Sequence, residues 1–146
     1  MKENTFEVSM KLLNDLKNAM SKSEKVRPKV GGFPYLAECL REKGFTKNTW
    51  YLPSGDSFYF TKEDSLVIPG TPLIEDMTTY PLYSEEKLIR ALRADQSGET
   101  TFPEFLINTW KAGVVKYEVN FIERYVIYYS ADDQEYKETY PAVEIN

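Results

Sequence analysis

The sequence predicts an α+β protein in which an α-α-β-β-β unit occurs twice and forms an antiparallel sheet with its helices packed on one face. Three observations predict this class. The chain matches itself at a shift of 69 residues, each half has two stretches with helical spacing of apolar residues, and each half continues in short alternating segments. Because this period exceeds that of solenoids and propellers, we expect a single domain, residues 1–146, built of two half-repeats (about 1–75 and 76–146) related by a pseudo-twofold axis.

The internal match is densest where residues 33–75 fall on residues 102–144. Random pairing of these positions would give roughly two or three identities. The identities are Phe33/Phe102, Pro34/Pro103, Gly44/Gly113, Lys47/Lys116, Tyr59/Tyr128, Asp64/Asp133, Pro72/Pro141 and Glu75/Glu144. The excess over random pairing predicts an internal duplication.

An amphipathic helix is predicted to open each half. In the first half it covers about residues 5–21, with one apolar face made of Phe6, Met10, Leu13, Leu16 and Met20. In the second half it covers about residues 85–95, where Ser84 is a good N-cap and the apolar face is Leu88, Ile89 and Leu92.

A second helix follows in each half, over about residues 34–43 and 102–112. Each has proline in its first turn, where the missing N–H costs nothing. Thr101 and Glu104 have the spacing of a capping box. Gly44 and Gly113 come just after the last turn, where a left-handed residue ends a helix.

Three strands are then predicted in each half, because apolar and polar residues alternate and aromatic and β-branched residues are frequent. A Pro-Ser-Gly-Asp turn at 53–56 separates the first two, and the segment 69–83 is expected to be irregular. The predicted strands are 47–52, 57–61, 65–68, 115–121, 125–130 and 136–140.

Composition excludes several chemistries. The 146 residues include no His and one Cys, which removes Ser-His and Cys-His catalysis, His-ligated metals and disulfides within the chain. We therefore predict no cofactor, no metal and no catalytic residues, and the sequence leans away from an enzyme without deciding the question. A net charge of −5 argues against nucleic acid and against an anionic membrane as partners.

The beginning of the chain has no apolar run of the kind found in signal peptides, and no stretch is apolar enough to cross a membrane. Together with the lone Cys39, which is expected to be a small buried apolar residue, this predicts a cytoplasmic protein.

Several long phrases carry a family resemblance: RPKVGGFPYLAECLREKGF, ALRADQSGETTFPEFLINTWKAGVVKYEV, YVIYY and ETYPAV. They resemble a family of small bacterial and prophage-borne proteins with no assigned function, some of which carry the label "phage envelope protein". The resemblance spans about residues 27–143. It implies a duplicated α+β fold and a cytoplasmic protein of bacterial or prophage origin, and it brings no reaction and no catalytic residues.

The segment before the second predicted helix is the candidate ligand site. Arg27, Lys29, Gly31 and Gly32 combine two positive charges with free backbone N–H groups at a helix N-terminus, which could cradle an anion. The alternative is a turn that needs a positive φ before the helix.

Acidic residues suggest a further hypothesis. Asp64 with Asp133, and Glu75 with Glu144, occupy equivalent positions in the two halves, so a pseudo-twofold axis could bring each pair together for acid–base catalysis.

A calcium loop is a second idea that the acidic residues raise. With Gly98 at the sixth position of an EF-hand loop, Glu104 falls at the twelfth, as required, but Arg93 stands where the first ligand must be, and only Asp95 and Glu104 remain as carboxylate ligands. We therefore predict no calcium site.

Three hypotheses about function stay open. The first is a non-catalytic binding or accessory protein whose partner is an unknown protein or small molecule, with a homodimer as one arrangement. It expects an exposed aromatic or apolar patch, which Tyr51, Tyr59, Tyr128 and Tyr129 could supply where they are exposed. The second is a small-metabolite enzyme that uses carboxylate, Tyr or Lys chemistry. The third is an anion or small-molecule sensor that uses the segment 27–32.

Overall fold

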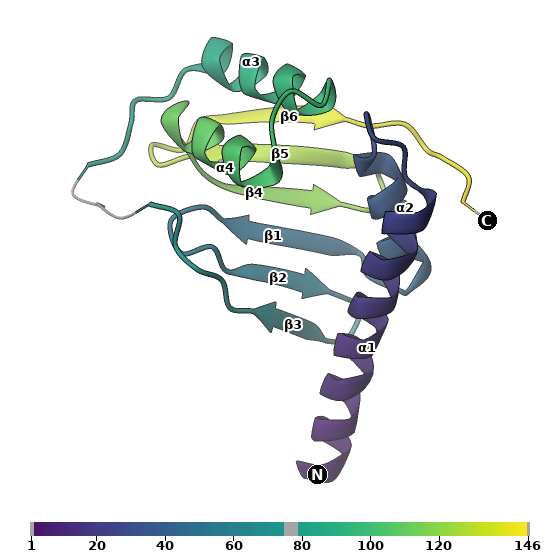
Figure 1. Ribbon diagram of the computed structural model, residues 1–146. Helices are drawn as coiled ribbons and strands as arrows, with labels where there is room; N and C mark the ends of the chain where they lie inside the picture. The colour runs from purple at the N-terminus through teal and green to yellow at the C-terminus, as the bar shows by residue number, and fades with distance from the viewer. Residues whose placement is uncertain (1, 75–78, 146) are drawn as a thin grey trace.

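The computed structural model describes residues 2–74 and 79–145, with side chains from Met10 onward. Within these residues the chain forms four helices and one six-stranded antiparallel sheet, which confirms the predicted α+β class. The helices are α1 (Lys2–Val26), α2 (Phe33–Glu42), α3 (Glu85–Gln96) and α4 (Phe102–Lys111). The strands are β1 (Lys47–Tyr51), β2 (Ser57–Phe60), β3 (Ser65–Ile68), β4 (Val114–Asn120), β5 (Tyr125–Ser130) and β6 (Glu135–Thr139). All four helices lie on the same side of the sheet (Figure 1).

The strand order is β3-β2-β1-β4-β5-β6, so the two halves meet where β1 pairs with β4. Thr49 lies opposite Glu118 at the centre of this pairing, with Lys47 opposite Asn120 and Tyr51 opposite Lys116. Positions 69 apart are thus equally far from the central pair. The α-α-β-β-β order occurs twice along the chain, while its origin by duplication stays a prediction.

The helix α1 differs from the prediction in its length and in its buried face. It is longer than the predicted 5–21, and its buried side chains are Leu12, Leu16, Ala19 and Ser23. Met10, which was predicted to face the core, is 43% exposed, and the side chain of Phe6 lies outside the described part of the chain. The physical reason is that α1 packs against α2, and the buried positions Leu12, Leu16, Ala19 and Ser23 recur every three or four residues on one side of the helix. That side includes the small residues Ala19 and Ser23, so apolar spacing alone did not identify it.

The second helices match the prediction closely, because their start and stop signals are local. In α4 the Thr101 N–H donates to Glu104 Oε1 at 2.9 Å and the Glu104 N–H donates to Thr101 Oγ1 at 3.3 Å, which confirms the capping box. Both helices are followed by a glycine in the left-handed region, with φ of +94° at Gly44 and +92° at Gly113.

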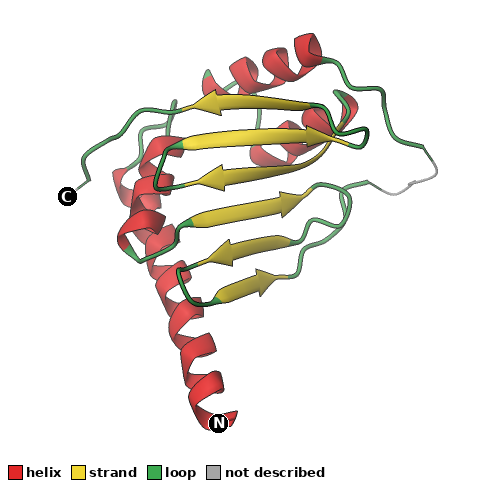
Figure 2. Cartoon of the chain, turned by 180° about the vertical axis from the view of Figure 1, so that it is seen from behind, coloured by secondary structure: helices red, strands yellow, loops and turns green. Residues whose placement is uncertain are grey.

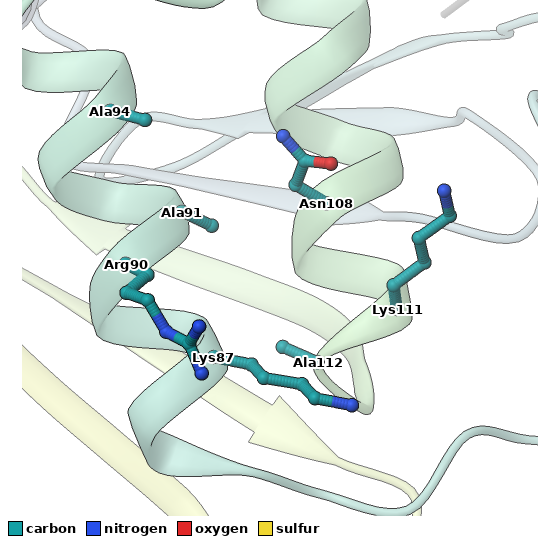
Figure 3. Close-up of a pocket in the computed structure, with 7 residues that line it drawn as sticks. All are labelled: Lys87, Arg90, Ala91, Ala94, Asn108, Lys111 and Ala112. Atoms are coloured by element: carbon teal, nitrogen blue, oxygen red, sulfur yellow. The ribbon is translucent and has the colours of Figure 1, made fainter.

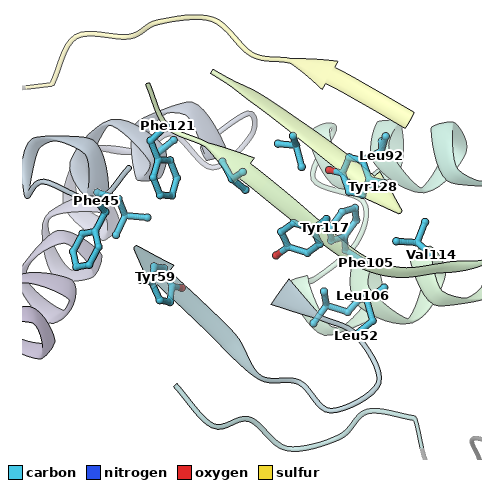
Figure 4. Packing of buried hydrophobic residues seen from close by; sticks show 14 of the residues in the cluster. Phe45, Leu52, Tyr59, Leu92, Phe105, Leu106, Val114, Tyr117, Phe121 and Tyr128 are labelled. Carbon is cyan, nitrogen blue, oxygen red and sulfur yellow. The ribbon is translucent and has the colours of Figure 1, made fainter. Parts of the chain in front are cut away.

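The core lies between the helices and the sheet (Figure 4). Tyr59, Tyr117 and Tyr128 project from three different strands into this layer and are buried there. Phe105 and Leu106 of α4 belong to the same cluster as Leu52, which follows β1. The core therefore runs through both halves, and Tyr59 and Tyr128 are not available as surface residues.

The connection between the halves has no helix or strand in its described residues, 69–74 and 79–83, as predicted. Its last residues pack tightly on the start of β4. The Ser84 N–H donates to the Ala112 carbonyl at 2.8 Å, and a Cβ placed on Gly113 would lie 2.5 Å from Tyr83 Cα. None of the described helices combines the length and the apolar character needed to cross a membrane.

Candidate functional site

The face of the sheet that points away from the helices is covered by no described helix or loop (Figure 2). We call this surface the open face. Since successive side chains of a strand point to opposite faces, the strand registers assign its members. They are Lys47, Thr49, Tyr51, Phe58, Phe60, Ser65, Val67, Lys116, Glu118, Asn120, Tyr125, Ile127, Tyr129, Glu135, Lys137 and Thr139.

Lysines of the open face lie over aromatic rings. Lys47 Nζ is 5.4 Å from the centroid of the Phe60 ring, and Lys116 Nζ is 4.9 Å from that of Tyr129. Each lysine stands directly across from its ring on the neighbouring strand. Lys137 makes a third such contact with Tyr125, at 4.2 Å. Each contact contributes about 0.5–1 kcal/mol at an exposed position, and together they hold the charged groups in place.

The rings themselves form a row along β1 and β2. Tyr51 meets Phe58 edge to face at 5.7 Å, and Phe58 lies nearly parallel to Phe60 at 6.4 Å. Tyr51 is 40% exposed and Val67 is 47% exposed. The row therefore offers rigid apolar area that solvent can reach.

The open face is nearly neutral, whereas the chain as a whole is acidic. It carries the three lysines above and two acids, Glu118 and Glu135. Lys47 Nζ and Glu118 Oε1 form an ion pair at 3.6 Å. Burial raises the pKa of Tyr129, and the nearby Glu118 carboxylate raises it further, so its hydroxyl stays protonated at neutral pH. A partner approaching this face meets mixed chemistry and little net repulsion.

A shallow groove of about 270 Å³ lies between α3 and α4 (Figure 3). Three alanines line it, Ala91, Ala94 and Ala112. The polar groups around it come from Lys87, Arg90, Lys111 and Asn108. Glu86 pairs with Arg90 at 3.4 Å, and both side chains are largely exposed. The groove is basic although residues 76–146, which include α3 and α4, carry 13 acidic and 7 basic residues.

A second hollow of about 500 Å³ lies between α1, the loop after α2 and the β2–β3 turn. Apolar Leu12, Phe45 and Ile122 line it together with basic and acidic side chains. Lys11 Nζ pairs with Asp15 Oδ2 at 2.8 Å. The mixed rim gives this hollow no clear preference for either sign of charge.

A family model described as "Protein of unknown function (DUF1398)" matches residues 21–138. The chain belongs to this family. The match runs from the last turns of α1 into β6 and so includes every strand of the open face except the last residue of β6. The predicted resemblance to a family of unknown function is thereby confirmed, while the phage association stays a prediction.

Curated relatives of this DUF1398 chain come from mycobacteria. The uncharacterized protein Rv2012 of Mycobacterium tuberculosis (strain H37Rv) is 45% identical over 118 residues, which is 81% of this chain and 72% of the relative. The uncharacterized protein Mb2035 of Mycobacterium bovis matches with the same identity and coverage. The fold is therefore shared with mycobacterial proteins that are themselves uncharacterized.

The predicted ligand segment of the DUF1398 chain forms the loop between α1 and α2. Gly31 has the positive φ, +70°, that a turn before a helix was expected to need. Arg27 folds back on Gly32, because a Cβ at Gly32 would lie 3.2 Å from Arg27 Cδ. Lys29 is exposed, and neither hollow is lined by these four residues. Anion binding at this loop stays a prediction.

The hypothesis that equivalent acids converge is wrong for Asp64 and Asp133. Asp64 lies in the β2–β3 turn and Asp133 in the β5–β6 turn, at opposite edges of the sheet. The physical reason is that the halves join through β1 and β4, which places their outer hairpins as far apart as the sheet allows. Glu75, the partner proposed for Glu144, lies outside the described residues.

Two other sequence predictions concern metal and thiol chemistry. Glu104 is engaged in the capping box, and the described residues contain no group of three His, Cys, Asp or Glu side chains that could hold a metal ion. Cys39 is buried as predicted, and burial raises the pKa of its thiol, which disfavours the reactive thiolate.

The Lys–aromatic contacts of the open face are what sequence reasoning missed. The sequence did contain a signal for these contacts. At the shift of 69 residues Lys47 matches Lys116, and the aromatic Phe60 matches the aromatic Tyr129. Finding the contacts also required the β1–β2 and β4–β5 registers, which a single sequence does not provide.

Proposed function

We propose that this protein is a non-catalytic binding protein whose binding surface is the open face. The observation that carries the proposal is the repeated lysine–ring contact, Lys47 over Phe60 and Lys116 over Tyr129. The two contacts lie on either side of the central β1–β4 pairing. A surface of rigid rings and anchored cations loses little side-chain entropy on binding, which favours recognition.

A protein is the partner that this surface fits best. Small-molecule sites are concave and bury most of their ligand, whereas the open face is one side of a sheet. Tyr and other aromatic residues are enriched at the centres of protein interfaces, where their rings bury large apolar areas. We further infer a cytoplasmic location from the single, buried Cys39, and a bacterial or prophage origin from the family resemblance.

Quantitative co-purification from the native host tests the proposal. The tagged full chain is compared with a Tyr51→Thr/Tyr129→Thr variant, in which both replacements favour strands. Leu82→Thr is the matched control, because the Leu82 side chain is 91% exposed and Leu82 belongs to the connection and not to the open face. Thermal unfolding verifies that all three forms are folded.

The expected result is a protein partner that the Tyr51→Thr/Tyr129→Thr variant loses by tenfold or more, an effect of about 1.4 kcal/mol, and that the Leu82→Thr control retains. Equal recovery of every partner by the folded double variant would overturn the proposal. So would turnover of a metabolite by the purified chain.

The basic groove between α3 and α4 favours a second candidate function, the binding of a small anion. Lys87, Arg90 and Lys111 surround it, and the Asn108 amide adds neutral hydrogen-bonding groups. A titration with citrate, followed by NMR shifts of the backbone amides, tests this idea. Shifts confined to the groove and abolished by Lys87→Gln/Lys111→Gln would support it, and shifts at the 27–32 loop would favour the site predicted from the sequence instead.

A further inference from the structure

The two edges of the sheet differ in how they are protected. The edge strand β6 carries Glu135, Lys137 and Glu138, and charges on an edge discourage pairing with another strand. The other edge strand, β3, reads Ser-Leu-Val-Ile and has no charged residue. No described ribbon lies beyond β3 in the plane of the sheet (Figure 2).

The outward backbone groups of β3 follow from the β2–β3 hairpin. The Thr61 N–H donates to the Asp64 carbonyl at 2.9 Å, so these two residues are a hydrogen-bonded pair. Hydrogen-bonded and non-hydrogen-bonded pairs alternate along an antiparallel ladder. The registered pairs then place the N–H and C=O groups of Leu66 and Ile68 toward β2, and direct those of Ser65 and Val67 away from the sheet.

We propose that two copies of this chain join through β3 and form one continuous antiparallel sheet. A twofold axis at Leu66 places Ser65 of each copy opposite Val67 of the other. The outward groups of these two residues then make four hydrogen bonds across the junction, as in an ordinary ladder. This is the strand addition by which extended segments join an exposed sheet edge.

The long helix α1 supplies a second, independent observation. Its N-terminal half extends past the β3 edge, beyond the last strand of its own sheet (Figure 1). Met10, on this half, is 43% exposed, and Leu13 is only partly buried. In the joined sheet the N-terminal half of α1 in each copy lies over β3 of the other copy. There the exposed apolar side chains of the helix would be covered by the neighbouring sheet.

The union does not depend on the proposed function, because it uses the outward backbone groups of the β3 edge and not the lysine–ring contacts of the open face. It has a consequence for that face, however. The twofold axis stands perpendicular to the sheet, so the open faces of both copies point to the same side. A partner with two matching sites would bind the pair more tightly than a single chain, through effective concentration.

Sedimentation equilibrium of the full chain over a range of concentrations tests the proposal. Val67→Pro removes one outward N–H in each copy without breaking a β2–β3 bond, and proline is tolerated at such edge positions. Lys137→Pro is the matched control, because the Ser130 N–H donates to the Gln134 carbonyl at 2.9 Å, which by the same alternation directs the Lys137 N–H outward on β6. Val67→Lys keeps the N–H and adds a charge to the edge.

We expect a wild-type dimer whose dissociation constant rises about tenfold or more in Val67→Pro, because two hydrogen bonds are lost per dimer. Val67→Lys is expected to weaken it as well, and Lys137→Pro to leave it unchanged. Amide hydrogen exchange at Ser65 and Val67 should slow as the protein concentration rises. A chain that stays monomeric at about millimolar concentration would overturn the proposal. So would a dimer insensitive to Val67→Lys, or one that Lys137→Pro dissociates instead.

Discussion

Gly44 and Gly113 end the second helix of each half with almost the same backbone angle, φ of +94° and +92°, but their surroundings differ. A Cβ built on Gly44 would meet no atom within 4 Å. A Cβ built on Gly113 would lie 2.5 Å from Tyr83 Cα and 2.8 Å from the Leu82 carbonyl carbon. One glycine is required by its conformation alone, and the other also by the close approach of the connection between the halves.

Alanine substitutions separate these two requirements. Gly44→Ala is expected to cost about 1–2 kcal/mol, the penalty of a left-handed residue that bears a Cβ. Gly113→Ala is expected to cost about 4 kcal/mol or more, because backbone atoms must also move. Urea unfolding of both variants measures the difference, and equal losses of stability would contradict the close packing of Leu82 and Tyr83 on β4.

The features that could be predicted from the sequence are those whose causes are local. The Thr101–Glu104 capping box and the glycines after each second helix lie within a few residues of the structure they determine. The buried face of α1 could not be predicted in the same way. Leu12 and Met10 both fit helical spacing, but the buried side of α1 is the one that carries Leu12, Ala19 and Ser23, and two of these three residues are too small to stand out in an apolar pattern.

The candidate site could be predicted only in part for a related reason. A period of two shows which side chains share a face, but the neighbours across strands depend on the register. Lys116 and Tyr129 are adjacent only because β4 and β5 pair at that register. The hypothesis that Asp64 and Asp133 converge was wrong because it assumed a pseudo-twofold axis without knowing which strands meet there. The halves join through β1 and β4, and this leaves the two acids at opposite edges of the sheet.

The core offers a second prediction at the end of the sheet next to α2. Phe45 is fully buried and meets Tyr59 edge to face at 5.9 Å. Phe45→Ala is expected to destabilise the protein by about 3–5 kcal/mol, through lost transfer energy and the cavity left behind. Ile122→Ala is the control, because Ile122 is 54% exposed and its truncation leaves no buried cavity. Chemical unfolding measures the free energy of unfolding of both variants. Similar losses of stability would contradict the assignment of Phe45 to the buried core.

A third prediction concerns the acid limb of the pH–stability profile. The Arg41 guanidinium donates to both oxygens of Glu38, at 2.6 and 2.8 Å, and these bonds hold the pKa of the Glu38 carboxyl below its usual value. A lowered folded-state pKa contributes stability above the unfolded pKa, about 4.3 for Glu, and that stability is lost as the pH falls through the folded-state pKa.

Glu38→Gln should therefore lower the Tm at pH 7. The difference in Tm between the variant and the wild type should become smaller as the pH falls below about 4. Glu42→Gln is the matched control on the same helix. Its ion pair with Lys22, at 3.2 Å, joins side chains that are 41% and 39% exposed, so its removal should change the Tm little. A Glu38→Gln effect that does not vary with pH would contradict the role given to the Arg41 bonds.

Asp95 should behave in the opposite way. Burial raises the pKa of its carboxyl, and no salt bridge to this carboxylate is found among the described residues. It lies near the buried Tyr117 and Tyr128, whose pKa values burial raises and the Asp95 charge raises further. A raised folded-state pKa means that the contribution to stability is complete below the unfolded pKa and is lost as the pH rises through the folded-state pKa. Ionised Asp95 therefore destabilises the folded protein at neutral pH.

Asp95→Asn removes this destabilising charge, so the variant should have a higher Tm than the wild type at pH 7. The gain should fall toward zero below about pH 4, where the wild-type carboxyl is protonated in both states. Calorimetry at a series of pH values measures the profile. Asp132→Asn serves as the control of opposite sign, because the Ser130 hydroxyl and the Gln134 amide donate to the Asp132 carboxylate and lower its pKa. A gain for Asp95→Asn that stayed constant from pH 3 to pH 7 would show that packing, and not ionisation, sets the effect of this residue.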